Sequence, residues 1–352
     1  MRFSFLLGCL FGLLLMSEAC TSIVVSGRAS ADGRPFIFKN CDAKNYEVCV
    51  TIDGGKGCYK YLALVSSKTI KHNRVTCGFN EAGFAIINTN THNQNGDKQD
   101  HAENNRLMYR ALKICTTIND FEHMLDTLPR PMHLNTCYGV MDGKGAVAII
   151  EAHNLGYVKY DANDSTIAPT GWIVRTNYAL SGDLTNMVGK KRYDTMCEFA
   201  NTNAKDGRID YRDIIYEATR YGSIPTRVTA DAMLIQGVKN DENPLGTIAW
   251  TACGSPLVIP VIPLWITPDG FLPRMVKAAP GCKPSPLASM SIAKRKRLSS
   301  PIKRDFVDLL RPVENEIHSK ASKAIKSQRR QKCKNKVVEK FYIWLDRYLS
   351  QI

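Results

Sequence analysis

Two short apolar runs near the N-terminus, CTSIVV at residues 20–25 and PFIF at residues 35–38, decide how the fold is interpreted. Both are rich in β-branched or aromatic residues, which favour strands. Between them lies the polar segment SGRASADGR at residues 26–34, whose composition is typical of a turn. Two such runs joined by a turn predict a β-hairpin.

The end of the predicted hairpin is the tetrapeptide KNCD at residues 39–42. Because a hairpin returns the end of its second strand to the start of its first, Lys39 and Asp42 are expected near Cys20. A cation there would stabilise a thiolate, and a carboxylate would hold or orient an amine. The alternative is that both are ordinary surface residues at a strand end.

The first nineteen residues are expected to be a signal peptide. Arg2 precedes an apolar run at residues 3–16, which is too short to span a bilayer. Small residues follow at Ser17 and Ala19, as a signal peptidase requires, so Cys20 is expected to begin the mature chain. We therefore expect export to a periplasm or the extracellular space. Attachment of lipid to Cys20 is the alternative, and it would block the amine.

An N-terminal cysteine combines a nucleophile and a base in one residue. A thiol has a pKa of about 8.5, and a free α-amine, with a pKa of about 7.7–8.0, is partly neutral at physiological pH. The pairing of a threonine nucleophile with an N-terminal amine follows the same chemistry. The alternative is a cysteine that forms half of a disulfide.

The segment from Cys20 to Asp42 resembles the N-terminal-nucleophile (Ntn) hydrolases of the choloylglycine hydrolase, penicillin V acylase and acid ceramidase superfamily. Their mature chains begin with Cys and a β-rich run, and carry Arg-x-x-Asp a short way downstream. Asp42 matches the last position of that motif. Lys39 stands where the family has Arg, which keeps the charge but loses the planar guanidinium.

Further segments carry the same resemblance. NEAGFAIINTN at residues 80–90 is similar to a family segment that leads to an oxyanion-hole residue, which we match to Asn90, with Asn88 as the near alternative. WIVRTNY at residues 172–178 resembles a strand whose Asn contacts the substrate amide, which here is Asn177. Arg192 is matched to the family's second catalytic Arg. Without the resemblance, the sequence favours an ordinary turn residue at Asn90 and a solvent-exposed helix residue at Arg192.

The resemblance implies an α+β Ntn-hydrolase fold, a four-layer αββα sandwich, here with a C-terminal helical extension. We expect a signal peptide at 1–19, a catalytic domain at 20–290 and a basic helical extension at 291–352. The hydrophobic pattern predicts helices at 105–128, 209–221 and 229–237 and, around a basic segment at 320–336, two terminal helices. It also predicts strands at 136–141, 146–150, 247–252 and 256–266, and a linker at 276–300.

Charge and composition limit the function classes. The chain has 352 residues and a net charge of +14. Residues 291–352 hold 17 Lys and Arg against 6 Asp and Glu, so the main body is nearly balanced and no nucleic-acid partner is expected. There is no CxxC or HExxH motif, and no metal or cofactor is expected. Membrane-surface contact through the basic helices and a homo-oligomer stay open as partner hypotheses, and no transmembrane span is expected.

The sequence thus predicts an exported Ntn hydrolase that cleaves a linear, non-peptide C–N amide bond of a small-molecule N-acyl substrate through Cys20. The site residues expected with it are Lys39, Asp42, Asn90, Asn177 and Arg192. An acyltransferase or a dipeptidase on the same fold, and a non-enzymatic secreted binding protein, are the alternatives. The ten cysteines other than Cys9 and Cys20 permit disulfides, but their pairing cannot be deduced.

Overall fold

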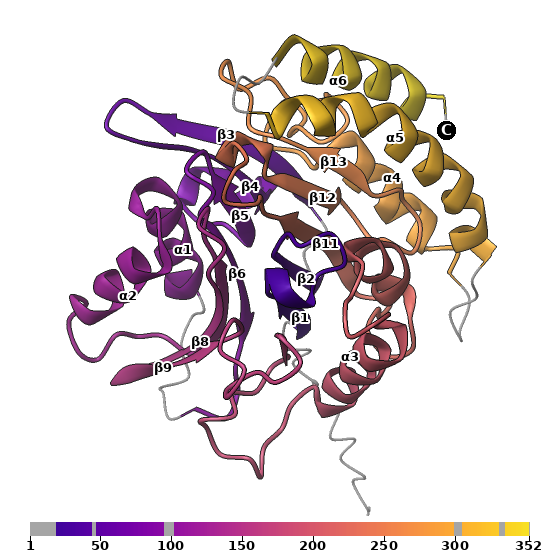
Figure 1. Cartoon of the computed structure of the whole chain (residues 1–352). Coiled ribbons are helices and arrows are strands. Elements are labelled where there is room, and N and C mark those ends of the chain that lie inside the picture. Colours follow the sequence, from indigo (N-terminus) through magenta and orange to yellow (C-terminus); the bar gives the residue numbers. More distant parts are fainter. Residues whose placement is uncertain (1–18, 44–46, 95–101, 299–304, 331–334, 352) are drawn as a thin grey trace, which may run out of the picture.

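The structure is a computed structural model that describes residues 19–43, 47–94, 102–298, 305–330 and 335–351. It is built on two antiparallel sheets (Figure 1). The six-stranded sheet has the order β10 (Trp172–Arg175), β1 (Ala19–Val25), β2 (Phe36–Asp42), β11 (Thr229–Gln236), β12 (Ile248–Ala252) and β13 (Ile262–Leu264). The seven-stranded sheet runs in chain order: β3 (Val48–Gly55), β4 (Cys58–Ser66), β5 (Cys77–Asn80), β6 (Ala85–Asn90), β7 (Thr136–Met141), β8 (Val147–His153) and β9 (Gly156–Asp161).

Helices cover the outer face of each sheet. The seven-stranded sheet is covered by α1 (Ala102–Ile114) and α2 (Ile118–Asp126), which contact β4, β5, β6 and β9. The six-stranded sheet is covered by α3 (Lys190–Asn203), α4 (Pro286–Arg295), α5 (Asp305–Gln328) and α6 (Asn335–Leu349) (Figure 1). These layers confirm the predicted α+β fold with four αββα layers.

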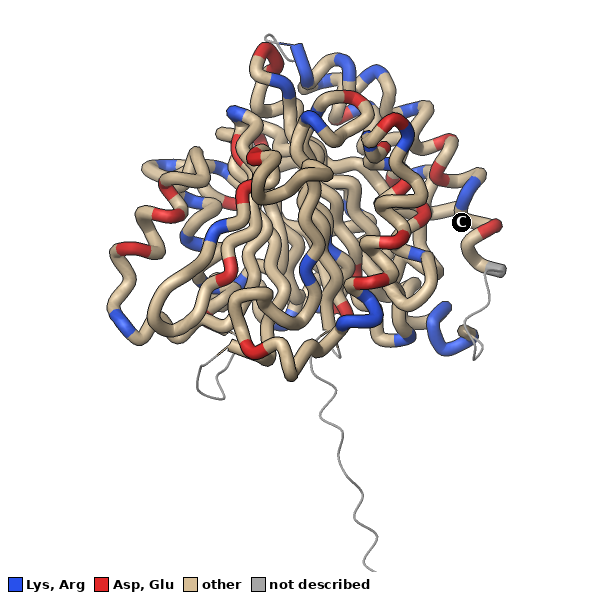
Figure 2. Tube along the Cα trace, turned by 60° about the horizontal axis from the view of Figure 1, so that its bottom comes forward, with Lys and Arg blue, Asp and Glu red and all other residues tan. Residues whose placement is uncertain are grey.

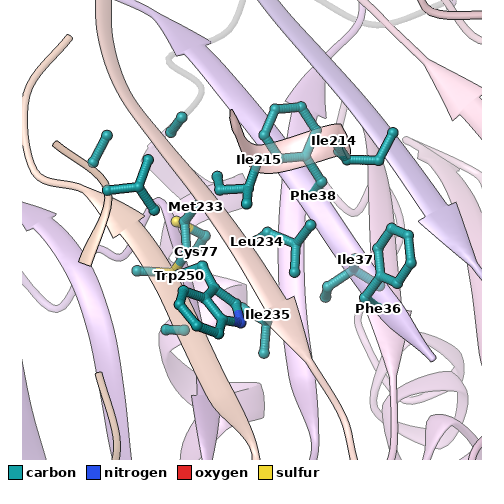
Figure 3. Close-up of a cluster of buried hydrophobic side chains, with 14 of the residues drawn as sticks. Phe36, Ile37, Phe38, Cys77, Ile214, Ile215, Met233, Leu234, Ile235 and Trp250 are labelled. Atoms are coloured by element: carbon teal, nitrogen blue, oxygen red, sulfur yellow. The ribbon is translucent and has the colours of Figure 1, made fainter. Parts of the chain in front are cut away.

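Strand residues alternate between two apolar cores. In β6, Ala85 and Ile87 belong to the core between the sheets, whereas Ile86 belongs to the core under α1 and α2. Because both faces are buried, such strands appear in the sequence as continuous apolar runs. Figure 3 shows the core at β2 and β11, where Phe38 and Leu234 lie near Ile215.

The predicted hairpin and several other elements are confirmed. β1 pairs with β2 in antiparallel register, from Ala19 opposite Asp42 to Val25 opposite Phe36. The strands predicted at 136–141, 146–150 and 247–252 correspond to β7, β8 and β12. The two terminal helices are present as α5 and α6, although residues 331–334 of the basic segment lie outside the described residues.

The prediction of a helix at 229–237 is wrong, because this segment forms β11. All eight residues of β11 are buried between β2 and β12. A short run that is buried on both faces has no amphipathic period to separate strand from helix. Tertiary pairing with two neighbouring strands therefore decides the conformation.

Proline and capping residues account for other differences. Within the strand predicted at 256–266, only β13 forms, and it contains Pro263. Before it, Pro256 and Pro260 lack the amide hydrogens that a ladder uses. The helix predicted at 105–128 is divided at Thr117, which caps α2 in a capping box with Asp120.

Two further segments differ from the sequence interpretation. The stretch 209–221 forms a π-helical turn followed by a 3₁₀ turn rather than one α-helix. The predicted linker at 276–300 contains α4, whose N-cap Ser285 accepts a hydrogen bond from the Ala288 amide at 3.2 Å. The expected domain boundary between 290 and 291 falls within α4.

The C-terminal helices share the core of the main body. Ile317 of α5 and Leu345 of α6 are fully buried in it. The Tyr342 hydroxyl accepts a hydrogen bond from the Trp265 amide at 2.6 Å and donates to the Trp265 carbonyl at 3.2 Å.

Lys and Arg are mixed with Asp and Glu along the outer helices, and the central strands carry few charges (Figure 2). Across the described ranges, no helix combines the length and apolarity needed to cross a bilayer.

A buried ion pair connects α5 to the main body. The Arg220 guanidinium donates to both carboxylate oxygens of Glu314, at 2.6 and 2.9 Å, and the Val261 amide donates to Glu314 Oε1 at 2.9 Å. Both charged side chains are at most 4% exposed. Removal of one partner would leave a buried charge without compensation, which is far more costly than loss of an exposed pair.

We predict that Glu314→Ala lowers the free energy of unfolding by about 3–5 kcal/mol, because the Arg220 charge stays buried. The matched control is Arg311→Ala, which breaks the more exposed Arg311–Glu217 pair and should cost at most about 1 kcal/mol. Urea unfolding of both variants checks this. Equal losses would contradict the prediction.

Candidate active site

Cys20 lies near the start of β1, in the interior of the six-stranded sheet. It is opposite Cys41 of β2 and is 3% exposed. Its nitrogen is here part of the peptide bond to Ala19 and marks the place of the α-amine that cleavage after Ala19 would leave. Residues 1–18 of the predicted signal peptide lie outside the described residues.

The nitrogen of Cys20 is held by Asn177. It donates a hydrogen bond of 2.9 Å to Asn177 Oδ1. Asn177 follows β10, the strand next to β1, and is fully buried. Its Nδ2 donates to the Asn90 carbonyl at 2.8 Å. The sequence-predicted Asn177 therefore binds the Cys20 nitrogen, and it connects the two sheets at this point.

Arg192 supports the same arrangement from α3. Its guanidinium donates to Asn177 Oδ1 at 2.7 Å, to Thr21 Oγ1 at 3.1 Å and to the Cys20 carbonyl. Burial lowers the pKa of Arg192, and the negative charges of Asp42 and Cys20 oppose this effect. Gly189 caps α3 with φ +87°, and a Cβ there would come within 2.6 Å of Arg192 Nη2. The glycine therefore provides the space that the guanidinium occupies.

Lys39 and Asn88 form a second buried contact. The Lys39 ammonium donates to Asn88 Oδ1 at 2.8 Å and to the Thr76 carbonyl at 3.1 Å. Burial acts to lower the pKa of Lys39, but the negative charges that Cys20, Cys41, Cys77 and Asp231 can carry together outweigh this effect, so the pKa is raised. Lys39 and Cys20 line the same cavity.

Asn90 is oriented by other amides. Its Oδ1 accepts hydrogen bonds from Asn104 Nδ2 at 2.9 Å and from Asn88 Nδ2 at 3.2 Å. Since the oxygen is held in this way, Nδ2 is the donor atom of the Asn90 side chain. Asn88 and Asn90 are two residues apart on β6 and line the same cavity as Cys20.

Asp42 lies beside the cavity rather than in its wall. It is 1% exposed and opposite Ala19, and its Oδ1 accepts a hydrogen bond of 2.6 Å from Thr229 Oγ1. Its Oδ2 has no hydrogen-bond partner among the described residues. Burial raises the pKa of Asp42 to about 6, although Thr229 and Arg192 act to lower it.

The cavity at Cys20 has a volume of about 150 Å³. Lys39, Asn88 and Asn90 line it, and the structure adds residues that the sequence interpretation did not assign: Cys41, Arg74 and Asp231. Larger hollows lie elsewhere among the described residues, such as those lined by Arg212 and the one lined by Phe271, and no cysteine lines these. Among the described residues, no group of three or more His, Cys, Asp or Glu side chains could hold a metal ion.

Glu151 is a supporting residue that sequence reasoning missed. Its carboxylate accepts hydrogen bonds from Arg175 Nε at 2.6 Å and from the amides of Leu180 and Ser181 at 2.9 and 2.8 Å. It thereby fixes both ends of the segment that carries Asn177. A charged residue within the apolar run AVAIIEA at 146–152 was the available signal, because carboxylates are seldom fully buried unless they are paired.

We predict that Asp42→Asn reduces the pH dependence of stability of the uncleaved chain. The ordinary pKa of 3.8 rises to about 6 in the folded state. Between these values the unfolded chain has lost a proton that the folded chain keeps, so stability falls as pH rises. The loss is at most about 3 kcal/mol, and asparagine should remove it.

Urea unfolding at about pH 4 and pH 7 provides the measurement. The control is Asp206→Asn, a substitution in an exposed turn, which should keep the pH dependence of the wild type. An unchanged pH dependence in Asp42→Asn would show that burial does not perturb this carboxyl.

Comparisons with known proteins give structural likenesses only. No protein-family model and no curated protein sequence matches the chain. Among solved structures, it is similar to the Caenorhabditis elegans ortholog of N-acylethanolamine-hydrolyzing acid amidase, with 13% identity, a TM-score of 0.46 and coverage of 61% of this chain and 92% of that one.

Two bacterial structures show a comparable likeness. A variant of the conjugated bile acid hydrolase from Clostridium perfringens has 12% identity and a TM-score of 0.48, and the match covers 70% of this chain and 92% of that one. Penicillin V acylase from Agrobacterium tumefaciens has 12% identity and a TM-score of 0.45, with coverage of 71% and 87%.

Proposed function

We propose that the mature chain is an exported Ntn hydrolase that cleaves a linear, non-peptide C–N amide bond of an N-acyl substrate, with Cys20 as nucleophile. The observation that carries the proposal is the position of Cys20. Its nitrogen is bound by Asn177, and Cys20 lines a cavity together with Lys39 and Asn90. The sequence resemblance to Cys-initiated amide hydrolases supports the same chemistry.

The first step is removal of the thiol proton by the α-amine. After cleavage behind Ala19, the Cys20 nitrogen is a primary amine. Donation of one N–H to Asn177 Oδ1 leaves its lone pair to accept the proton. Because thiol and amine have unperturbed pKa values of about 8.5 and 7.7–8.0, the transfer costs little. Lys39 then stabilises the thiolate as a neighbouring cation.

The sulfur attacks the acyl carbonyl, and negative charge develops on the carbonyl oxygen. Asn90 Nδ2 is the proposed donor to this oxyanion, and loss of one such donor typically costs about 10²–10³ in rate. Asn177 Nδ2 already donates to the Asn90 carbonyl, so we assign Asn177 chiefly to holding the amine. This differs from the contact with the substrate amide that the sequence resemblance implied for Asn177.

Collapse of the tetrahedral adduct breaks the C–N bond. The amine product leaves with a proton from the Cys20 ammonium, and the acyl group stays on sulfur as a thioester. Water attacks this thioester while the α-amine again serves as base, which releases the acid and restores the thiol. Asp42, one residue from the amine in the strand register, balances the ammonium charge. The mechanism uses no metal or organic cofactor.

We predict that Cys20→Ala abolishes amide cleavage, with a loss of at least about 10³-fold, because the nucleophile is removed. Release of amine from a panel of N-acyl amides measures this. Cys253→Ala is the matched control, since Cys253 is also buried but does not line the cavity. Full turnover by Cys20→Ala would refute the mechanism.

The same assay distinguishes the alternative functions. With excess amine acceptor, new amide product indicates an acyltransferase, whereas free acid alone indicates a hydrolase. Cleavage of dipeptides in preference to N-acyl amides would indicate a dipeptidase. Complete protection of Cys20 from thiol reagents, with no turnover, would favour a binding protein.

We predict that the exported protein begins at Cys20 with a free amine. N-terminal sequencing and intact-mass measurement check both features. Ala19→Arg should block cleavage, because signal peptidase requires a small residue at this position. The uncleaved variant should be inactive, since its Cys20 nitrogen stays an amide and cannot accept a proton. Full activity of an uncleaved chain would exclude the α-amine as the base.

A further inference from the structure

Cys41 lies directly opposite Cys20 on the neighbouring strand, and the proposed mechanism gives it no role. We propose that Cys41 is a resolving thiol, which captures peroxide-oxidised Cys20 as a reversible Cys20–Cys41 disulfide. The disulfide stops amide cleavage and protects the nucleophile from irreversible oxidation. Its formation is independent of the proposed function, whereas the loss of cleavage that accompanies it rests on that function.

The backbone of Cys20 shows which kind of strand pair the two cysteines form. Its nitrogen donates to Asn177 Oδ1, and its carbonyl accepts from the Arg192 guanidinium. Because both groups bind partners outside β2, Cys20 and Cys41 are a non-hydrogen-bonded pair. In such pairs the Cα atoms are about 4.5 Å apart, and disulfides join residues whose Cα atoms are about 4.4–6.8 Å apart. The strand register therefore suits a disulfide.

The two side chains already contact each other. Residues directly opposite in an antiparallel pair lie on the same face of the sheet, and Cys20 and Cys41 line the same cavity. The Cys41 thiol forms a side-chain hydrogen bond with Cys20, and neither residue is in a disulfide in the structure. Oxidation would thus replace an existing contact between two thiols with a bond, and no distant groups have to be brought together.

The surroundings give the two thiols different roles. Lys39 is two residues from Cys41 on β2, so both side chains lie on one face, and Lys39 interacts electrostatically with both cysteines. The hydrogen bond to Cys20 and burial raise the pKa of the Cys41 thiol well above its ordinary value, although Lys39 opposes them. Cys41 therefore keeps its proton when Cys20 reacts, and Cys20 is the thiolate that meets the oxidant first.

A peroxide is the oxidant in this reaction. The Cys20 thiolate attacks one peroxide oxygen, the O–O bond breaks, and the hydroxide that leaves takes up a proton to become water. Cys20 is then a sulfenic acid. The Cys41 sulfur attacks the Cys20 sulfur, the S–O bond breaks, and the hydroxyl leaves as water with the Cys41 proton. Two thiols and one hydrogen peroxide thus give one disulfide and two waters, and an external thiol reverses the oxidation.

Capture by Cys41 has two consequences for the enzyme. The disulfide occupies the sulfur that attacks the substrate, so cleavage stops until the bond is reduced. Without a neighbouring thiol, a sulfenic acid is oxidised further to sulfinic and sulfonic acids, which simple thiols do not reduce. Under the proposed export, the protein works outside the reducing cytosol, where a reversible form of Cys20 preserves activity.

Peptide mapping of the mature protein tests the disulfide directly. The reduced protein is treated with hydrogen peroxide, its remaining thiols are alkylated under denaturing conditions, and it is digested with trypsin. Mass spectrometry should find the peptides of residues 20–28 and 40–44 joined, with two hydrogens fewer than the separate peptides. Dithiothreitol should separate them. Amide cleavage should fall as the joined peptide forms and return when it is reduced.

Two cysteine variants assign the effect to Cys41. Cys41→Ala should give no joined peptide, and its fraction of sulfinic and sulfonic Cys20 should exceed that of the wild type at least about tenfold, because capture by a held neighbour is an intramolecular step. Its cleavage, relative to the same variant without peroxide, should not return with dithiothreitol. The matched control is Cys77→Ala, which should behave like the wild type. Cys77 is buried and interacts with Lys39, but it does not line the cavity.

The possible outcomes separate this inference from the proposed function. Irreversible oxidation of Cys20 that is as fast in the wild type as in Cys41→Ala would overturn the inference. So would a disulfide between Cys20 and Cys77, or no reaction of Cys20 with peroxide. A Cys20–Cys41 disulfide in a protein that cleaves no amide would support the inference and count against the proposed function. Cleavage that depends on Cys20, without the disulfide after peroxide treatment, would overturn the inference and keep the proposed function.

Discussion

The hydrogen bond between the Cys20 nitrogen and Asn177 Oδ1 is the contact on which the site depends. It joins the first strand of the chain to a segment more than 150 residues away. Asn177 is in turn held by Arg192 and by the Asn90 carbonyl, so elements of both sheets and of α3 meet at one side chain. An error in the register of β1 would disperse all of these groups, because strand residues change face at every position.

Much of this arrangement could be predicted from the sequence. The hairpin follows from two β-rich runs around a polar turn, and it places Lys39 and Asp42 beside Cys20 as expected. Asn90, Asn177 and Arg192 were proposed from their segments, and the structure brings the three together. The role of each of these side chains in the site was less predictable. A side-chain amide can donate or accept, and only its surroundings determine which group it presents to the substrate.

The remaining features depend on tertiary contacts that no local pattern encodes. Asp231 lies in a run that looked helical and proved to be the central strand β11, because pairing on both edges overrides the apolar pattern. Asn104 and Arg74 reach the site region from elements packed around it, and their spacing in the chain gives no hint of this. The size of the cavity is likewise set by side chains from several strands, so it is known only after the sheets are assembled.

The position of Ala19 within β1, paired with Asp42, has a consequence for how activity would be controlled. The partners of the Cys20 nitrogen are already in place while that nitrogen is still acylated by Ala19. Scission of one peptide bond would then convert a latent precursor into the working enzyme with no rearrangement of the sheets. Under the proposed function, the chain would therefore be inactive before export and become active only after cleavage.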